Sequence, residues 1–171
     1  MKKNILITGF TPFLDHKINP SQEIANLLKD SFSTIVFEVS YEKVTHKLLQ
    51  LDLESYDAII LLGLSSNRNK ISIEKFAYNL IDVAKPDNDN IIKQNEPILV
   101  GGRPKISTEF NLGEITKVLE EEWQYSDDPG RYLCNFLFYK VLNRNRNSVF
   151  IHLPKNCDSY RLSENIKKLF S

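Results

Sequence analysis

Three side chains of this chain supply the groups that catalysis by a thiol nucleophile requires. Cys134 stands near the start of an apolar segment that predicts a buried helix over residues 131–143, and the N–H groups at a helix N-terminus favour the reactive thiolate. His152 follows the apolar run 148–151, so we expect an imidazole at the carboxyl end of a strand, where ligands bind in open parallel sheets. Glu74 adds a carboxylate that can orient an imidazole.

Each of these residues also has an ordinary structural explanation when it is taken alone. Cys134 fits an inert cysteine in the core, His152 fits a histidine that caps a strand, and Glu74 fits a strand residue that faces solvent. Taken together, they supply a nucleophile, a general base and the group that orients the base.

Composition and charge narrow the class of protein. Lys+Arg and Asp+Glu number 22 each, so no net charge draws the chain to nucleic acid or to an anionic membrane. The longest apolar runs, such as residues 58–62, are far shorter than the roughly 20 residues that cross a bilayer. The first residues lack the small-residue cleavage site of a signal peptide. We therefore expect neither nucleic-acid binding nor membrane association.

Length and cysteine count point to one compact unit in a reducing compartment. The chain has 171 residues, about the size of one domain, and we expect a single domain over residues 1–171. Two cysteines are too few for a disulfide framework, which favours the cytoplasm. The three histidines and two cysteines show no metal-ligand spacing, so no metal is expected.

Apolar runs alternate with segments of helical periodicity, which predicts an α/β fold. The βαβαβ pattern at the start of the chain favours a three-layer α/β/α sandwich with a mostly parallel central sheet. Asn19 and Pro20 are a typical helix start, with Asn as the N-cap and Pro at the first helical position. The expected strands are residues 4–8, 33–39, 57–63 and 148–151, and the expected helices include residues 112–122 and 131–143 with a C-terminal helix around 162–170.

The middle of the chain departs from this alternation. Residues 71–82 have a strand-like pattern whose apolar positions change face at Glu74, and this slip predicts a β-bulge, a feature enriched near active sites. Residues 97–100 and the turn Gly101-Gly102 predict a short strand of an added β-hairpin, preceded by a loop over residues 85–96.

Four segments together resemble the pyroglutamyl peptidase I (pyrrolidone carboxyl peptidase) family of cysteine peptidases. They occur in the family's order and extend over most of the chain. The segments are residues 8–13 with 18–21, residues 71–79 followed by Asp82 and 86–88, residues 130–135 with Tyr139, and residues 150–154.

The resemblance implies a peptidase that removes an N-terminal 5-oxoproline (pyroglutamyl) residue from peptides. Cys134 would attack the carbonyl, His152 would deprotonate the thiol and protonate the leaving amine, and Glu74 would orient His152. Phe10 and Phe13 match the aromatic residues that sandwich the flat lactam ring, a neutral group that buries well between aromatic faces. Asn19 is included with them among the expected substrate-binding residues; the family is cytosolic, needs no cofactor and often forms dimers or tetramers.

The chain also departs from the family pattern, which leaves a second interpretation open. The two glycines that usually follow the second Phe are Leu14-Asp15, Arg131 lies three residues before the nucleophile, and Ala84 replaces an arginine expected to help the oxyanion. The loops between Cys134 and His152, and those after His152, are shorter than is usual. Arg131 and Ala84 favour the alternative, a catalytically impaired homologue that binds peptide N-termini or serves as a scaffold.

Overall fold

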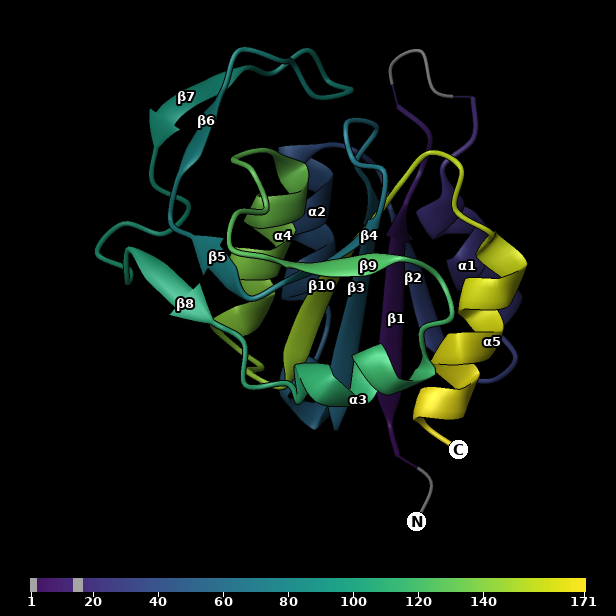
Figure 1. Ribbon diagram of the computed structural model, residues 1–171. Helices are drawn as coiled ribbons and strands as arrows, with labels where there is room; N and C mark the ends of the chain where they lie inside the picture. The colour runs from purple at the N-terminus through teal and green to yellow at the C-terminus, as the bar shows by residue number, and fades with distance from the viewer. Residues whose placement is uncertain (1–2, 14–16) are drawn as a thin grey trace.

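The central element is a six-stranded sheet with the strand order β2-β1-β3-β10-β4-β9 (Figure 1). The computed structural model describes residues 3–13 and 17–171. The strands of this sheet are β1 (Ile5–Phe10), β2 (Ser33–Phe37), β3 (Ala58–Leu64), β4 (Ile71–Glu74), β9 (Trp123–Ser126) and β10 (Ser148–Leu153). The helices are α1 (Pro20–Leu28), α2 (Tyr41–Leu49), α3 (Leu112–Val118), α4 (Leu133–Leu142) and α5 (Ser159–Leu169), with a 3₁₀ turn at Leu53–Ser55.

The middle of the sheet consists of parallel strands that are buried along their whole length. Every residue of β1, β3 and β10 is buried, as expected for strands covered on both faces. Pairing is parallel between β1 and β2, between β1 and β3 and between β3 and β10. The carboxyl ends of these strands therefore meet at one edge, the upper edge in Figure 1.

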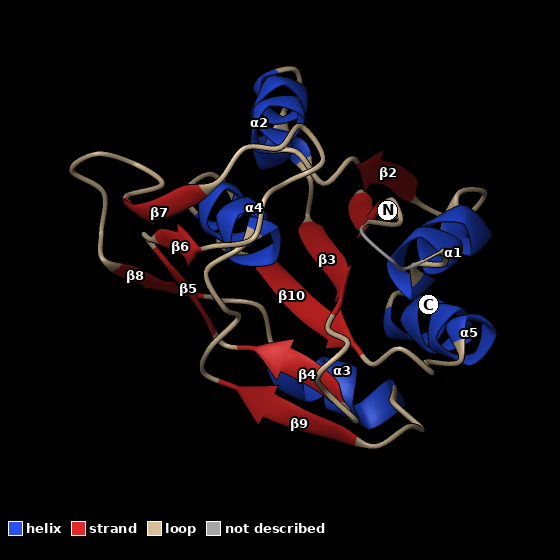
Figure 2. Ribbon diagram, turned by 90° about the horizontal axis from the view of Figure 1, so that it is seen from above, coloured by secondary structure: helices blue, strands red, loops and turns tan. Residues whose placement is uncertain are grey.

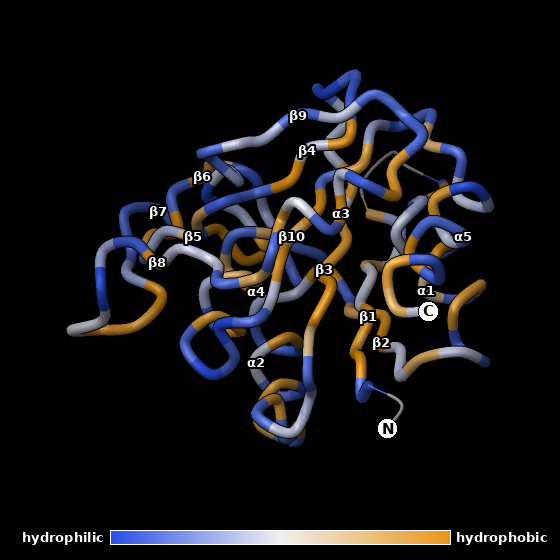
Figure 3. The backbone as a smooth tube through the Cα atoms, turned by 60° about the horizontal axis from the view of Figure 1, so that its bottom comes forward, coloured by the Kyte–Doolittle hydropathy of each residue, from blue (hydrophilic) through white to orange (hydrophobic). Residues whose placement is uncertain are grey.

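Helices cover both faces of this sheet, which confirms the predicted three-layer α/β/α architecture. Ile59 and Leu61 of β3 pack in one core with residues of α2 and α4, while Ile60 and Leu62 pack in a second core with residues of α1, α3 and α5. Figure 2 shows the two groups of helices on opposite sides of the strands. In Figure 3 the apolar colour follows β1, β3 and β10 through the middle of the molecule.

Strand direction changes on one side of the sheet. β4 pairs antiparallel with β10, and β9 pairs parallel with β4, so both run against the other four strands. We did not expect β9, because two of its four residues, Gln124 and Tyr125, are exposed and its sequence lacks an apolar run.

The expected β-bulge at Glu74 is wrong. β4 ends at Glu74, and the chain then leaves the central sheet to form β5 (Phe76–Tyr78) and β6 (Ile81–Val83). β5 pairs antiparallel with β8 (Lys105–Ser107), and β6 pairs antiparallel with β7 (Lys93–Glu96). The change of face in the sequence marks this change of sheet.

The added hairpin exists, but it lies elsewhere than expected. Residues 97–100 are not a strand; β7 instead occupies Lys93–Glu96, within the segment predicted as a loop. The whole excursion over residues 76–107 closes on itself, because Thr108 N–H donates to the Lys75 carbonyl at 3.0 Å.

The one predicted helix cap is confirmed, and one helix end differs clearly from the prediction. The Asn19 side chain accepts from Ser21 N–H with Pro20 at the first helical position, as predicted. α3 ends at Val118, four residues earlier than expected, and the acidic run 120–122 connects it to β9. Within the described part of the chain, no helix is long and apolar enough to cross a membrane.

Candidate functional site

The buried pair of His152 and Glu74 is the centre of the candidate site. The two residues lie on neighbouring antiparallel strands, where His152 is opposite Ser72 and Glu74 is opposite Phe150. Such diagonal neighbours are within reach of long side chains. His152 Nδ1 lies 2.7 Å from Glu74 Oε1, and the two residues are 4% and 0% exposed. The predicted contact between histidine and glutamate is therefore present.

Arg68, which sequence reasoning missed, completes a charged cluster around this pair. Its Nη1 lies 2.8 Å from Glu74 Oε1, the oxygen that also contacts His152, and its Nη2 donates to the Asp128 carbonyl at 2.8 Å. Arg68 lies in the loop after β3, where no periodicity or motif singles it out from the other Lys and Arg residues. Its guanidinium offers the buried carboxylate a countercharge.

The cluster favours a neutral imidazole with one defined tautomer. Burial lowers the pKa of His152, and the charge of Arg68 lowers it further, although the bond to Glu74 opposes both effects. A neutral His152 that donates its Nδ1 proton to the Glu74 carboxylate leaves Nε2 unprotonated. Nε2 is then able to accept a proton from a nucleophile.

Cys134 lies in the first turn of α4 and is brought to the sheet at Gly63. A Cβ atom built on Gly63 would lie 2.9 Å from Cys134 Sγ, so a glycine is required for the thiol to approach β3 so closely. Gly63 is in turn the register partner of His152 in the β3–β10 ladder. Gly63 therefore adjoins both the thiol and the strand position that carries the imidazole.

The expected lowering of the thiol pKa is wrong. The cap residue Tyr132 makes no side-chain cap hydrogen bond to α4, so the helix N-terminus is open toward Cys134. Burial nevertheless raises the pKa of Cys134 to about 12, and the charge of Glu74 adds to this effect, while Arg68 and Lys85 oppose it. Desolvation is therefore the largest cause of the shift in the thiol pKa.

An aromatic pocket adjoins Cys134. Phe10 is buried and packs against Phe37 with ring centroids 6.1 Å apart, whereas Phe13 is half-buried and lies 6.3 Å from the ring of Tyr132. Tyr132 was not among the predicted residues. The free volume is about 20 Å³, enough for about one water molecule. The lining residues are Phe10, Phe13, Asn19, Val39, Leu64, Tyr132, Leu133 and Cys134.

Asn19 lines this pocket, but its polar atoms serve the local fold. Its Oδ1 accepts from both the N–H and the hydroxyl of Ser21, and its Nδ2 donates to the Thr11 carbonyl at 3.2 Å. Asn19 thus fixes the start of α1 against the end of β1. Contact with a substrate stays a prediction for this residue.

Arg131 is held beside the site by its own contacts. Its guanidinium lies 4.0 Å from the centre of the Tyr78 ring, and its Nη1 lies 2.6 Å from Asp128 Oδ1. Ala84 is exposed and leaves its position without a cation. The other departure, Leu14-Asp15, lies outside the described residues.

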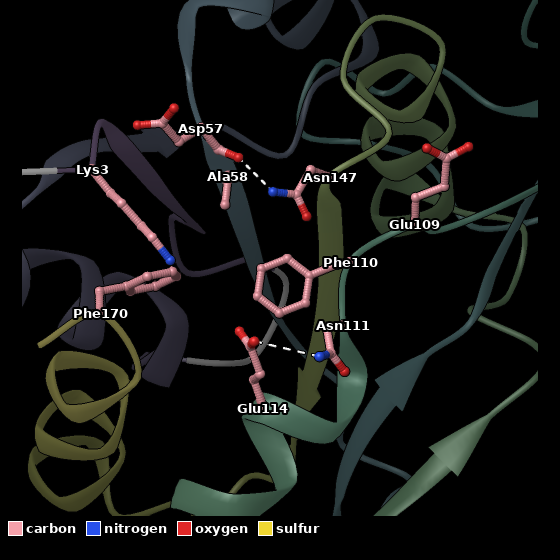
Figure 4. Close-up of a pocket in the computed structure, with 9 residues that line it drawn as sticks. All are labelled: Lys3, Asp57, Ala58, Glu109, Phe110, Asn111, Glu114, Asn147 and Phe170. Carbon is pink, nitrogen blue, oxygen red and sulfur yellow. Dashed lines mark hydrogen bonds between the residues drawn. The ribbon is translucent and has the colours of Figure 1, made fainter. Parts of the chain in front are cut away.

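A roomier hollow lies at the opposite edge of the sheet and lacks comparable chemistry (Figure 4). It has a volume of about 690 Å³ and adjoins Ala58 and Asn147, at the amino ends of β3 and β10. Its lining contains no cysteine and no histidine. Ligands in open α/β sheets bind at the carboxyl ends of the strands, where His152 and Cys134 lie. Among the described residues, no group of three or more His, Cys, Asp or Glu side chains is arranged to hold a metal ion.

The fold and the site define a class of α/β proteins that carry a carboxylate-bound imidazole at the carboxyl edge of the sheet and a thiol beside the neighbouring strand. Comparison with known proteins narrows this class. A family model described as pyroglutamyl peptidase matches residues 3–162. The pyrrolidone-carboxylate peptidase of Bacillus cytotoxicus is 32% identical over 169 residues, which cover 89% of this chain and 78% of the relative. That of Pyrococcus furiosus is 34% identical and covers 88% and 80%, respectively.

Solved structures agree with these sequence matches. Pyrrolidone carboxyl peptidase from Thermus thermophilus superimposes with a TM-score of 0.87 and 28% identity over 97% of each chain. The enzyme from Thermococcus litoralis gives a TM-score of 0.88 and 26% identity over 98% of this chain and 93% of the other. The chain belongs to the pyroglutamyl peptidase family.

Proposed function

We propose that this chain is a cysteine peptidase that hydrolyses the amide bond after an N-terminal pyroglutamyl residue. The observation that carries the proposal is the buried contact of 2.7 Å between His152 Nδ1 and Glu74 Oε1, next to the strand position at which Cys134 approaches the sheet. Family membership supports the substrate class. In this proposal Cys134 is the nucleophile, His152 is the general base and Glu74 orients His152.

The first half of the reaction forms a thioester. The Cys134 sulfur attacks the pyroglutamyl carbonyl carbon as His152 Nε2 takes the thiol proton, and the π electrons of the carbonyl move to its oxygen. Because the pKa of Cys134 is raised to about 12, the thiol carries its proton at neutral pH, so attack and proton transfer have to be coupled. In this proposal the N–H groups of the first turn of α4, which have no partner within the helix, stabilise the developing oxyanion.

Collapse of this intermediate releases the shortened peptide. The electron pair on oxygen re-forms the carbonyl, the C–N bond breaks, and the imidazolium of His152 gives its proton to the leaving amine. Water then attacks the thioester with His152 as base, which releases free 5-oxoproline and restores the thiol. Glu74 stabilises the imidazolium in both halves of the reaction.

We place the lactam ring between the faces of Phe10 and Phe13, beside Tyr132. A planar neutral ring fits an aromatic slot, but the present free volume of about 20 Å³ is too small for it. Substrate binding therefore requires the half-buried side chains of Phe13 and Tyr132 to move apart. Peptides with a pyroglutamyl N-terminus are the proposed partners, no cofactor enters the reaction, and the free thiols of Cys134 and Cys157 suit a reducing cytoplasm.

Hydrolysis of a fluorogenic pyroglutamyl amide tests the proposal. We expect turnover by the native chain and a loss of at least a thousandfold in Cys134→Ala and His152→Ala, as for other members of catalytic triads. Cys157→Ala is the matched control, because this second cysteine lines a different hollow, beside Pro154 and Arg161, and its variant should keep full activity. No turnover by a folded native protein would contradict the proposal and favour a homologue that only binds peptide N-termini.

A further inference from the structure

Lys85 is a cation that faces the aromatic pocket without a carboxylate partner among the described residues. Its Nζ lies 4.6 Å from the centre of the Phe13 ring and 5.4 Å from that of Tyr132, two of the rings that line the pocket next to Cys134. Within the described part of the chain, its recorded contacts are with these rings, and no ion pair includes it. Aromatic faces attract an ammonium group, but they do not neutralise its charge.

The loop that carries Lys85 is fixed on both sides of the site. The Tyr132 hydroxyl donates to the Pro86 carbonyl at 2.7 Å, which ties the loop to the start of α4. The Asp87 carboxylate accepts from the backbone N–H groups of Tyr41, Asp89 and Ile91 at 2.9–3.0 Å. Figures 1 and 2 both show β6, the strand just before this loop, beside α4. The backbone beside Lys85 is therefore held by hydrogen bonds, and the Lys85 side chain is half-buried.

Among the described residues, the charges that act on the thiol include one positive charge without a negative partner. Glu74 raises the pKa of Cys134, whereas Arg68 and Lys85 lower it. Arg68 is bonded to Glu74 at 2.8 Å, so these two charges largely cancel. Burial lowers the pKa of Lys85, and Cys134 raises it, so thiol and ammonium affect each other in both directions. Among the described residues, the other titratable groups coupled to the thiol are the hydroxyls of Tyr41 and Tyr132, whose pKa values are raised by burial and, to a smaller extent, by Cys134.

As the proton leaves Cys134 during the attack, one negative charge develops, shared by the sulfur and the carbonyl oxygen. We propose that Lys85 is a catalytic residue whose ammonium stabilises the negative charge that develops when the Cys134 thiol attacks a carbonyl carbon. Lys85 then contacts the reacting oxygen of the bound substrate, and Arg68 serves mainly as the partner of Glu74. This inference rests on the proposed function for its substrate. The effect of Lys85 on the reactivity of the Cys134 thiol can nevertheless be measured without any substrate.

The first test measures the thiol in the free protein. In a Cys157→Ser background, iodoacetamide reports on Cys134 alone, and its rate at a fixed pH of 9 follows the thiolate fraction because the pKa lies well above that pH. We expect Lys85→Met to slow alkylation about tenfold, as one unit of pKa would give, and Lys85→Arg to stay within about threefold. Lys105→Met is the matched control: its ammonium also lies over an aromatic ring, Phe76 at 3.9 Å, away from the thiol.

The second test separates binding from catalysis with the pyroglutamyl amide. We expect Lys85→Met to lower kcat by about tenfold to a hundredfold with KM within about threefold, because the charge acts on the transition state. Equal alkylation rates in Lys85→Met and the native background, with the fold intact by circular dichroism, would overturn the inference. If the native chain does not cleave the amide while the difference in alkylation holds, the proposed substrate fails and the role of Lys85 at the thiol stands.

Discussion

At the scale of the residue, the site is organised around one oxygen atom. Glu74 Oε1 contacts both His152 Nδ1 and Arg68 Nη1, at 2.7 and 2.8 Å, inside a carboxylate that is fully buried. A buried carboxylate without a countercharge is costly, and Arg68 supplies that countercharge to Glu74 beside His152. The same cation lowers the pKa of His152 and so extends the range of pH over which the imidazole is neutral.

Arg68→Met tests this double role through the pH profile of kcat/KM. Loss of the positive charge should raise the pKa of His152, so the acid limb of the profile moves to higher pH by about one unit. On that limb kcat/KM then falls about tenfold, whereas at pH 8, where the imidazole is neutral in both proteins, the shift itself has little effect. Arg68→Lys, which keeps the charge, should restore most of the shift. Arg144→Met removes an ion pair with Glu54 elsewhere and should leave the limb in place. An unchanged limb in Arg68→Met would show that Arg68 only supports the fold.

At the scale of the element, the site depends on how closely α4 approaches the sheet. Gly63 lies near the end of β3, and on one face of this strand it leaves room for both the Cys134 thiol and the ring of Phe150. A methyl group at this position would lie 2.7 Å from Phe150 Cζ and 2.9 Å from Cys134 Sγ. Phe150 belongs to the core, so the displacement has to be taken up partly by α4 and its thiol.

Gly63→Ala should therefore affect activity more than stability. We expect turnover of the pyroglutamyl amide to fall about a hundredfold, since a shift of about 1 Å in a reacting group has such an effect. The free energy of unfolding, measured in urea, should fall by about 1–3 kcal/mol from overpacking. Gly113→Ala in α3 is the control, because its methyl group would meet only the side chain of Asn111 at 3.3 Å. Equal losses of activity in the two variants would refute the argument.

The elements also show what the sequence could and could not predict. Buried parallel strands such as β3 leave an uninterrupted apolar run, and the cap at Asn19 leaves its own signature, so both were predicted. β7 and β9 were missed because their residues are mostly polar or exposed, as in Lys93–Glu96. The antiparallel direction of β4 could not be predicted, because apolar periodicity does not depend on strand direction. Cys134 and His152 could be predicted because their residue types are rare in this chain and their neighbours are distinctive. Arg68 and Lys85 could not, because they are two loop cations among 22 Lys and Arg residues.

At the scale of the whole molecule, two apolar cores on opposite faces of one sheet connect the beginning and end of the chain. Ile7 of β1, Leu62 of β3 and Ile166 of α5 belong to the same core, although they are far apart in sequence. Such long-range packing makes independent unfolding of one part costly, which is the physical basis for the predicted single domain over residues 1–171. The expected assembly into dimers or tetramers stays a prediction.

Urea denaturation followed by two probes tests the single domain. Trp123 is the only tryptophan and lies in the edge strand β9, so its fluorescence reports on the border of the sheet, while far-ultraviolet circular dichroism reports mainly on the helices. We expect the two transitions to coincide within error at one midpoint. A separate, earlier transition of the Trp123 signal would show that β4 and β9 form a unit of their own.

The closed excursion over residues 76–107 has a consequence for how this protein family can vary. Its two ends are joined by the bond between Thr108 N–H and the Lys75 carbonyl, directly after Glu74, and it carries Lys85 to the site. The exposed loops of this segment can be lengthened or shortened between relatives while Ala77, Ile81 and Ile106 keep their places in the core with α4. Natural variation in the charge beside the aromatic pocket can therefore arise from changes in the one loop that carries Lys85.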